Sequence, residues 1–181
     1  ESLLDTASEG LLDVCLIPIE KLVPFPNHPY KVTDDEAMDD LIESIKTFGV
    51  LEPISVRPLE DSTDEYEIIS GHRGCHAALR AGLKRIPALV YDVDRDDATI
   101  MLVDSNYHRE VILPSEKAFS YRMKAEALSH QGKSLTSGQI VPKSDDNRTT
   151  ASIGEPNGES YKTVQRYIRL TYLIPELLMM M

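Results

Sequence analysis

The chain has few cysteines, no long apolar run and no excess of basic residues, and each shortage excludes a class of protein. Its 181 residues include two cysteines, Cys15 and Cys75, too few for a disulfide framework and without the spacing of a metal site. No run of about 18 apolar residues is present, so we expect no membrane-spanning helix. A basic and apolar leader is also absent, and we therefore expect a protein of the reducing cytoplasm.

The charge of the chain is acidic and unevenly distributed. The formal net charge is −11, which argues against indiscriminate binding to nucleic acid. Residues 1–100 carry 21 acidic against 9 basic side chains, whereas residues 101–181 carry 9 against 10. The second half therefore has room for a local cationic surface, and we expect the two halves to have different roles.

Hydrophobic periodicity predicts strands and helices mixed in the first half and helices alone in the second. The length suits one medium domain or two small ones, and residues 1–13 read as a loose terminus. The expected strands are residues 14–19, 50–57, 66–69 and 86–91. The expected helices are residues 33–48, a short one ending at Gly82, and residues 98–107, 115–128, 147–155 and 160–173.

Polar residues at fixed spacings predict where several helices begin. The expected N-caps are Thr33 (in a capping box with Glu36), Asp96 or Asp97, Ser115 and Ser160. Residues 131–146 are polar and contain glycine and proline, so we expect a loop or a joint between domains there.

The most informative stretch runs from Ile68 to Gly82, where a predicted strand meets a Ser-Gly turn and a short helix. This geometry exposes backbone N–H groups to an anion, and a glycine permits the sharp turn. The candidate phosphate-binding residues are Ser70, Gly71, His72, Arg73 and Gly74, with His76 close by. The alternative is an ordinary strand-to-helix connection with a solvated basic turn.

A second candidate pair is Asn106 and Arg109, which are three residues apart at the end of the helix expected over residues 98–107. Side chains at this spacing can face the same way. The alternative is a C-capping asparagine next to a surface arginine.

The last two predicted helices are separated by Pro156-Asn157-Gly158, and the second of them is cationic. Residues 160–173 contain three basic side chains and no acidic one, with Val164, Ile168 and Tyr172 expected to face inward. A helix, a glycine turn and a polar, cationic helix are typical of a helix-turn-helix. The alternative is a plain helical hairpin. The expected DNA contacts are Ser160, Lys162, Thr163, Gln165, Arg166 and Arg169.

From Val14 to Leu178 the sequence resembles the ParB family of DNA-partition proteins, including its nucleoid-occlusion and plasmid relatives. Leu41–Val56 (LIESIKTFGVLEPISV) resembles the family's entry into its nucleotide pocket, and Ser70–Ala77 (SGHRGCHA) resembles its G-E-R-R-x-R-A phosphate box. SNYHR at 105–109, followed by LPSEKA, resembles its E-N-x-Q-R box. Gly158–Leu178 (GESYKTVQRYIRLTYLIPELL) resembles the end of its helix-turn-helix.

The resemblance implies an α+β fold: a ParB/sulfiredoxin-like αβ domain over residues 14–111, then an all-α domain over residues 112–181 with a helix-turn-helix at about 147–173. It also implies sequence-specific binding to double-stranded DNA, gated by CTP with Mg²⁺, in chromosome, plasmid or mobile-element partition. The implied partners are a second copy of the chain and a ParA-type ATPase, and the implied location is the nucleoid. The apolar end Leu177–Met181 suggests a truncated chain that lacks the dimerisation segment.

The phosphate boxes of this sequence depart from the family pattern. Gly71 and Arg73 match the first box, whereas His72 replaces its acid, and Gly74 and His76 replace two arginines. In the second box Asn106 and Arg109 match, and Ser105 and His108 stand at the positions of the acid and the glutamine. We expect triphosphate binding to be weaker than in the family. Because serine replaces the acidic residue at position 105, we also expect hydrolysis of the nucleotide to be impaired. Protonated histidines are candidate replacement phosphate donors.

An enzyme is the alternative, because the same αβ fold resembles sulfiredoxin and a free-serine kinase. The sulfiredoxin box reads G-C-H-R, with cysteine directly after glycine. In this sequence His72 follows Gly71 and Cys75 comes three positions later. We therefore expect Cys75 to be a small, semi-buried structural residue.

Overall fold

The computed structural model describes residues 13–60, 62, 64–107, 109, 112–134 and 146–172, without the side chains of 132–134 and 146–148. These residues divide into two compact units, which we describe separately. The sheet unit runs to Pro26 and resumes over Val32–Val93, and the helical unit contains Asn27–Lys31 and the chain from Asp94 onward. The boundary expected after Val111 stays a prediction, because it concerns the family's domains rather than this division.

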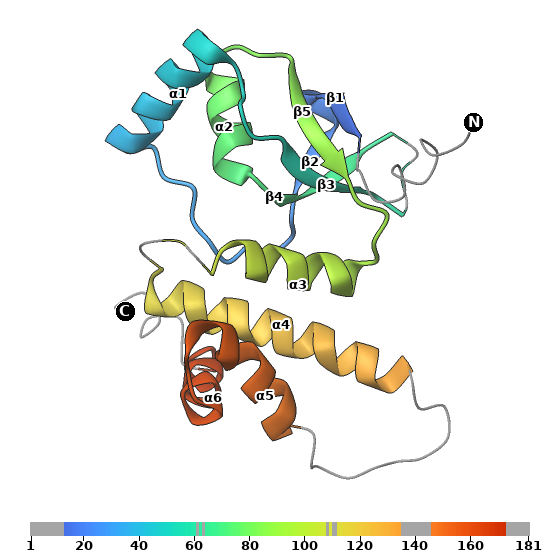
Figure 1. Cartoon of the computed structure of the whole chain (residues 1–181), viewed down its shortest axis with the longest axis vertical. Coiled ribbons are helices and arrows are strands. Elements are labelled where there is room, and N and C mark those ends of the chain that lie inside the picture. Colours follow the sequence, from blue (N-terminus) through green and yellow to red (C-terminus); the bar gives the residue numbers. More distant parts are fainter. Residues whose placement is uncertain are drawn as a thin grey trace, which may run out of the picture. The chain divides into compact units, whose positions relative to one another are not determined.

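The sheet unit contains five strands in one mixed sheet (Figure 1). The strands are β1 (Val14–Pro18), β2 (Leu22–Pro24), β3 (Ile54–Pro58), β4 (Tyr66–Ser70) and β5 (Arg85–Val90), with the 3-10 turn η1 (Ile19–Lys21) between the first two. Their order in the sheet is β1-β5-β3-β4-β2. Pairs β1–β5 and β3–β4 are antiparallel, and pairs β3–β5 and β2–β4 are parallel. β1 ends at Pro18 on an edge, as the sequence predicts for a proline-containing strand.

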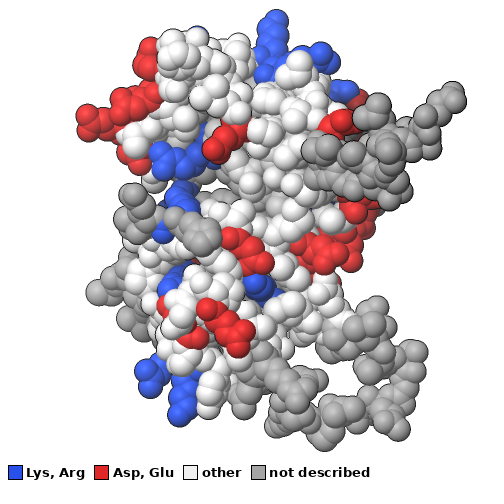
Figure 2. Space-filling model, in the orientation of Figure 1, with Lys and Arg blue, Asp and Glu red and all other residues white. Residues whose placement is uncertain are grey.

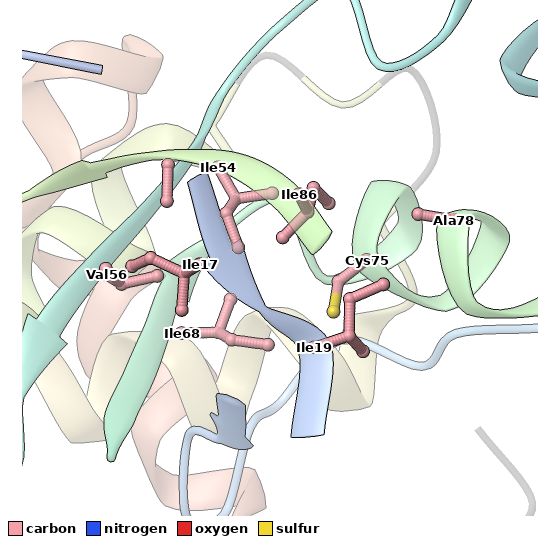
Figure 3. Close-up of a cluster of buried hydrophobic side chains, with 9 residues drawn as sticks. Ile17, Ile19, Ile54, Val56, Ile68, Cys75, Ala78 and Ile86 are labelled. Atoms are coloured by element: carbon pink, nitrogen blue, oxygen red, sulfur yellow. The ribbon is translucent and has the colours of Figure 1, made fainter. Parts of the chain in front are cut away.

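Two helices pack in succession beside this sheet: α2 (His72–Arg80) lies against the strands, and α1 (Glu36–Phe48) lies against α2 (Figure 1). Cys75 and Ala78 of α2 belong to the apolar cluster of the sheet (Figure 3). Ala77, on another face of α2, packs with three side chains of α1, Met38, Ile42 and Ile45. The small residues of α2 therefore allow close packing on two faces.

A buried ion pair joins the two central antiparallel strands. Arg57 of β3 and Glu67 of β4 are directly opposite in the register, and Arg57 Nε donates to Glu67 Oε2 at 2.7 Å. Both side chains are almost fully buried, so the Glu67 charge depends on Arg57 for compensation, while Arg57 Nη1 also lies 3.4 Å from Glu60 Oε1.

The helical unit contains four helices. They are α3 (Arg95–Ser105), α4 (Pro114–Ser134), α5 (Asp146–Gly154) and α6 (Tyr161–Leu170), with the 3-10 turn η2 (Glu155–Asn157) between the last two. Tyr121 of α4, Ile153 of α5 and Val164 of α6 form its buried core cluster. Because α4 extends to Ser134, the loop expected from residue 131 begins later, and residues 135–145 lie outside the described residues.

The expected fold class, α+β followed by an all-α part, is confirmed, while several predicted details are wrong. α1 is capped by Asp35, whose carboxylate accepts from Met38 N at 2.9 Å, and the hydroxyl of Thr33 donates to Asp35 instead of capping. α3 is capped by Asp94 rather than by Asp96 or Asp97. α1 begins later than expected, at Glu36, and α3 begins earlier, at Arg95, so a different carboxylate takes the cap in each case. The remaining corrections are that α4 begins at Pro114, before Ser115, and that Tyr172 is 71 % exposed.

No helix in the described residues combines the length and the apolar character needed to cross a bilayer.

Gly71 joins β4 to α2 in a conformation that other residues adopt at a cost. Its φ is +91°, and a Cβ there would lie 2.6 Å from Cγ2 of Ile54 on β3. We predict that Gly71→Ala lowers the free energy of unfolding by roughly 1–3 kcal/mol from backbone strain alone, with a further loss from the clash. Urea unfolding followed by circular dichroism measures the change.

Gly74→Ala is the matched control, because a Cβ at Gly74 meets no atom within 4 Å. Gly74 lies inside α2, where alanine is the better helix former, so this variant should be as stable as the parent chain or slightly more stable. Equal losses in the two variants would contradict the strained-turn account.

Candidate nucleotide and DNA interfaces

The turn between β4 and α2 presents backbone donors at the start of a helix. Gly71 is the left-handed N-cap of α2, and its carbonyl accepts the first helical hydrogen bond, from Cys75 N, at 2.9 Å. The N–H groups of the residues between them have no acceptor within the helix. The space beside Gly74 is open, so an anion can approach the backbone there.

Two arginines and a histidine of α2 contact two carboxylates at the start of α1. Arg73 Nη2 lies 3.6 Å from Asp35 Oδ1, while His76 Nε2 and Arg80 Nη1 lie 2.9 and 2.6 Å from Asp34 Oδ1. All five side chains are partly exposed. A phosphate at this turn would therefore have to share Arg73 with Asp35.

These contacts lower the pKa of both carboxyl groups. Hydrogen bonds from His76 and then from Arg80 lower the pKa of Asp34. The Thr33 hydroxyl and the Met38 N–H do the same for the pKa of Asp35. A lowered carboxyl pKa means that the ionised form is favoured in the folded chain, so this contribution is lost as the pH falls through that pKa.

The side chain of His72, the residue at the position of the family's acid, contacts the backbone of the sheet unit. The ring is half-buried, and Nε2 is 3.5 Å from the backbone N of Phe25. Its expected role as a phosphate donor stays a prediction.

Asn106 and Arg109 belong to the helical unit, and their roles differ. Asn106 caps the end of α3, and its side-chain amide donates to Leu102 O at 2.8 Å. The guanidinium of Arg109 lies 5.4 Å from the ring centroid of Tyr30. Among the described residues, Arg109 has no carboxylate partner, so its charge is available to an anion.

The position of the family's acid has no acidic side chain, and its serine is bonded locally. Ser105 Oγ donates to Leu102 O at 2.9 Å, in the last turn of α3. His108 lies outside the described residues. In the part of the chain that the structure describes, no group of three His, Cys, Asp or Glu side chains could hold a metal ion.

α5, η2 and α6 form the expected sequence of helix, turn and helix. Gly158, with φ +65°, ends η2, and Ser160 caps α6 by accepting from Thr163 N at 3.3 Å. The hydroxyls of Ser160 and Thr163 are also 3.0 Å apart, so both side chains are engaged at the cap.

The exposed face of α6 carries its basic residues. Lys162, Arg166 and Arg169 are exposed at four- and three-residue steps, while Val164 is fully buried on the opposite face. The described residues offer none of these three cations an acidic partner. Gln165 is half-buried and has other contacts within the protein. Figure 2 shows basic side chains projecting where α6 lies.

Cys75 is unsuited to chemistry, in agreement with its expected structural role. Cys75 is 8 % exposed and lies in the apolar cluster that includes Ile19 and Ile86 (Figure 3). Burial raises its pKa, which disfavours the reactive thiolate.

Sequence reasoning missed Asp34 and Asp35 as neighbours of the phosphate turn. No local pattern connects them with residues some forty positions later, since their meeting depends on the packing of α1 on α2.

Comparison with known proteins decides the family. The model of the ParB N-terminal domain matches residues 5–107, more than half of the chain. The chain belongs to the ParB family. A nucleoid occlusion protein of Listeria innocua is 36 % identical over 118 residues, which are 65 % of this chain and 41 % of the relative. The chain thus spans about two fifths of such relatives.

Two solved structures of ParB from Caulobacter crescentus, both C-terminally truncated, resemble this chain over both units. The one complexed with CTP-gamma-S is 30 % identical, with a TM-score of 0.50, and covers 91 % of this chain and 81 % of that one. The one complexed with the centromeric parS site is 29 % identical, with a TM-score of 0.56. The match covers 90 % of this chain and 74 % of the chain in that structure.

Proposed function

We propose that this chain is the nucleotide-gated, DNA-binding part of a ParB-type partition protein. α6 contacts double-stranded DNA, and the turn at Gly71, together with Asn106 and Arg109, binds CTP. The exposed cationic face of α6, in a chain with a formal net charge of −11, is the observation that carries the proposal.

The charges of α6 support the proposed binding to DNA. Lys162, Arg166 and Arg169 offer phosphate or base-edge contacts, as arginine and lysine side chains do in helix-turn-helix proteins. Ser160, Thr163 and Gln165 complete the candidate surface, with the two hydroxyls also close to backbone N–H groups at the start of the helix. The relative complexed with parS makes a centromere-like site the natural probe.

The donors at the α2 turn and the related structure with CTP-gamma-S support the proposed binding of CTP. Ser70, Gly71, His72, Arg73 and Gly74 would surround the phosphates. Asn106 and Arg109 would supply further contacts from the helical unit. Because two arginines of the family box are replaced, we expect weak binding.

Hydrolysis of CTP would be slow or absent. The acid of the family's second box is replaced by Ser105, whose hydroxyl is bonded to α3. A magnesium ion would be held chiefly by the phosphates of the nucleotide.

The remaining roles come from the family resemblance. They are dimerisation with a second copy, interaction with a ParA-type ATPase and association with the nucleoid.

We predict that Arg166→Ala weakens binding to a parS duplex about 5- to 150-fold, the range of one arginine contact of about 1–3 kcal/mol. If Arg166 contacts a phosphate, a plot of the logarithm of the association constant against the logarithm of the salt concentration becomes less steep, and the magnitude of its slope decreases by about one. Fluorescence anisotropy at several salt concentrations measures both. Lys46→Ala, which removes an exposed cation of α1, is the control and should leave affinity and slope unchanged. An unchanged slope and affinity in Arg166→Ala would place the DNA surface elsewhere.

We also predict saturable, CTP-selective binding that Arg73→Ala weakens at least tenfold, because a charge-assisted hydrogen bond contributes about 1.5–3 kcal/mol. Calorimetric titration with CTP, ATP and GTP in the presence of Mg²⁺ measures it. Arg85→Ala removes an exposed cation that belongs to β5 rather than to the turn, and this control should bind CTP as the parent chain does. Binding of CTP that is insensitive to Arg73→Ala would rule out the turn as the phosphate site.

A further inference from the structure

An acidic residue lies immediately before the N-cap of α6 and is held by α4. Glu159 precedes Ser160, and its carboxylate is bonded at both oxygens. Oε1 accepts from the ammonium of Lys117, and Oε2 accepts from the hydroxyl of Tyr121 at 2.9 Å. The Glu159 side chain is only 18 % exposed. The carboxylate therefore faces away from solvent, toward α4.

Lys117 is itself held among aromatic rings. Its ammonium lies 5.7 Å from the ring centroid of Tyr121 and 5.2 Å from that of Tyr167, and the two rings pack edge to face at 5.8 Å. The Tyr121 hydroxyl also accepts from Asn157 Nδ2 at 3.0 Å. This network, which we name the α4 clamp, consists of Lys117, Tyr121, Asn157, Glu159 and Tyr167. It links α4, η2 and α6.

The backbone of Glu159 is fixed independently of the clamp. Glu159 N donates to Gly154 O at 2.9 Å, and a Cβ at Gly154 would lie 2.4 Å from Glu159 O. Only the direction of the Glu159 side chain therefore depends on Lys117.

A carboxylate at this place has an alternative position that would oppose DNA binding. The N-terminus of a helix carries a partial positive charge and attracts anions, including a nearby carboxylate or a DNA phosphate. If Lys117 were absent, Glu159 could turn toward the start of α6, next to Lys162. There it would repel the phosphates that α6 is proposed to bind.

We propose that Lys117 is a positioning residue for DNA binding, which holds the Glu159 carboxylate away from the DNA-facing start of α6 and neutralises its charge. The inference rests on the proposed function of α6. It assigns the α4 clamp an electrostatic role in addition to packing.

A double-mutant cycle separates this role from simple stabilisation. The variants are Lys117→Met, which keeps the aliphatic stem, Glu159→Gln, which keeps the shape, and the two combined. Affinity for a parS duplex and for a random duplex is measured by anisotropy at low and moderate salt, with thermal unfolding in parallel. Lys46→Met breaks an exposed ion pair with Glu43 within α1 and serves as control.

We expect Lys117→Met to weaken parS binding about tenfold, more at low salt, and Glu159→Gln to leave affinity unchanged or raise it. The combined variant should return to within threefold of the parent chain, and the control should change less than threefold. A purely structural clamp predicts instead that both single variants weaken binding and that the combination does not rescue it. That result, or an unchanged affinity in Lys117→Met, overturns the inference.

The result also separates this inference from the proposed function. If Arg166→Ala weakens binding while Lys117→Met does not, α6 binds DNA and only the clamp proposal fails. If the parent chain binds neither duplex, both proposals fail.

Discussion

The left-handed backbone at Gly71 is the constraint on which the sheet unit and its candidate site depend. Ile54 of β3 occupies the space that a side chain at Gly71 would need, so the chain passes close to the sheet before α2 begins. The position at which α2 begins determines which of its side chains contact each neighbour. Cys75 and Ala78 pack against the sheet, and Ala77 packs against α1. The same start leaves Arg73 in the first turn, next to backbone N–H groups. Packing and the proposed anion recognition thus share one backbone feature.

Local pairing of charges makes the proposed binding of an anionic polymer at one place compatible with an acidic chain. Arg73 faces Asp35, and Lys117 faces Glu159. The cations of α6, in contrast, have no acidic partner in the described chain. Cations without an acidic partner are therefore grouped on one face of α6, which favours a specific contact there over general attraction to nucleic acid.

The sequence predicted most elements because their signals are local. The strands around residues 54–58 and 66–70 follow from β-branched runs, and the Ser160 cap and the buried Val164 follow from spacing within one helix. The caps of α1 and α3 were misplaced because several carboxylates compete within a few residues and only geometry selects Asp35 and Asp94. The pairing of Asp34 with His76 and Arg80, and of Glu159 with Lys117, joins residues about forty positions apart. Such contacts depend on tertiary packing, which no short pattern encodes.

The central proposal is that CTP binds the Gly71 turn, with Asn106 and Arg109 as further candidate contacts. Hydrogen–deuterium exchange of the intact chain, with and without CTP and Mg²⁺, tests it most directly. The account predicts that CTP slows exchange in peptides covering residues 70–76 and in peptides covering residues 105–109, with the same concentration dependence. Protection of one segment alone, or of neither under conditions where CTP is bound, would contradict it.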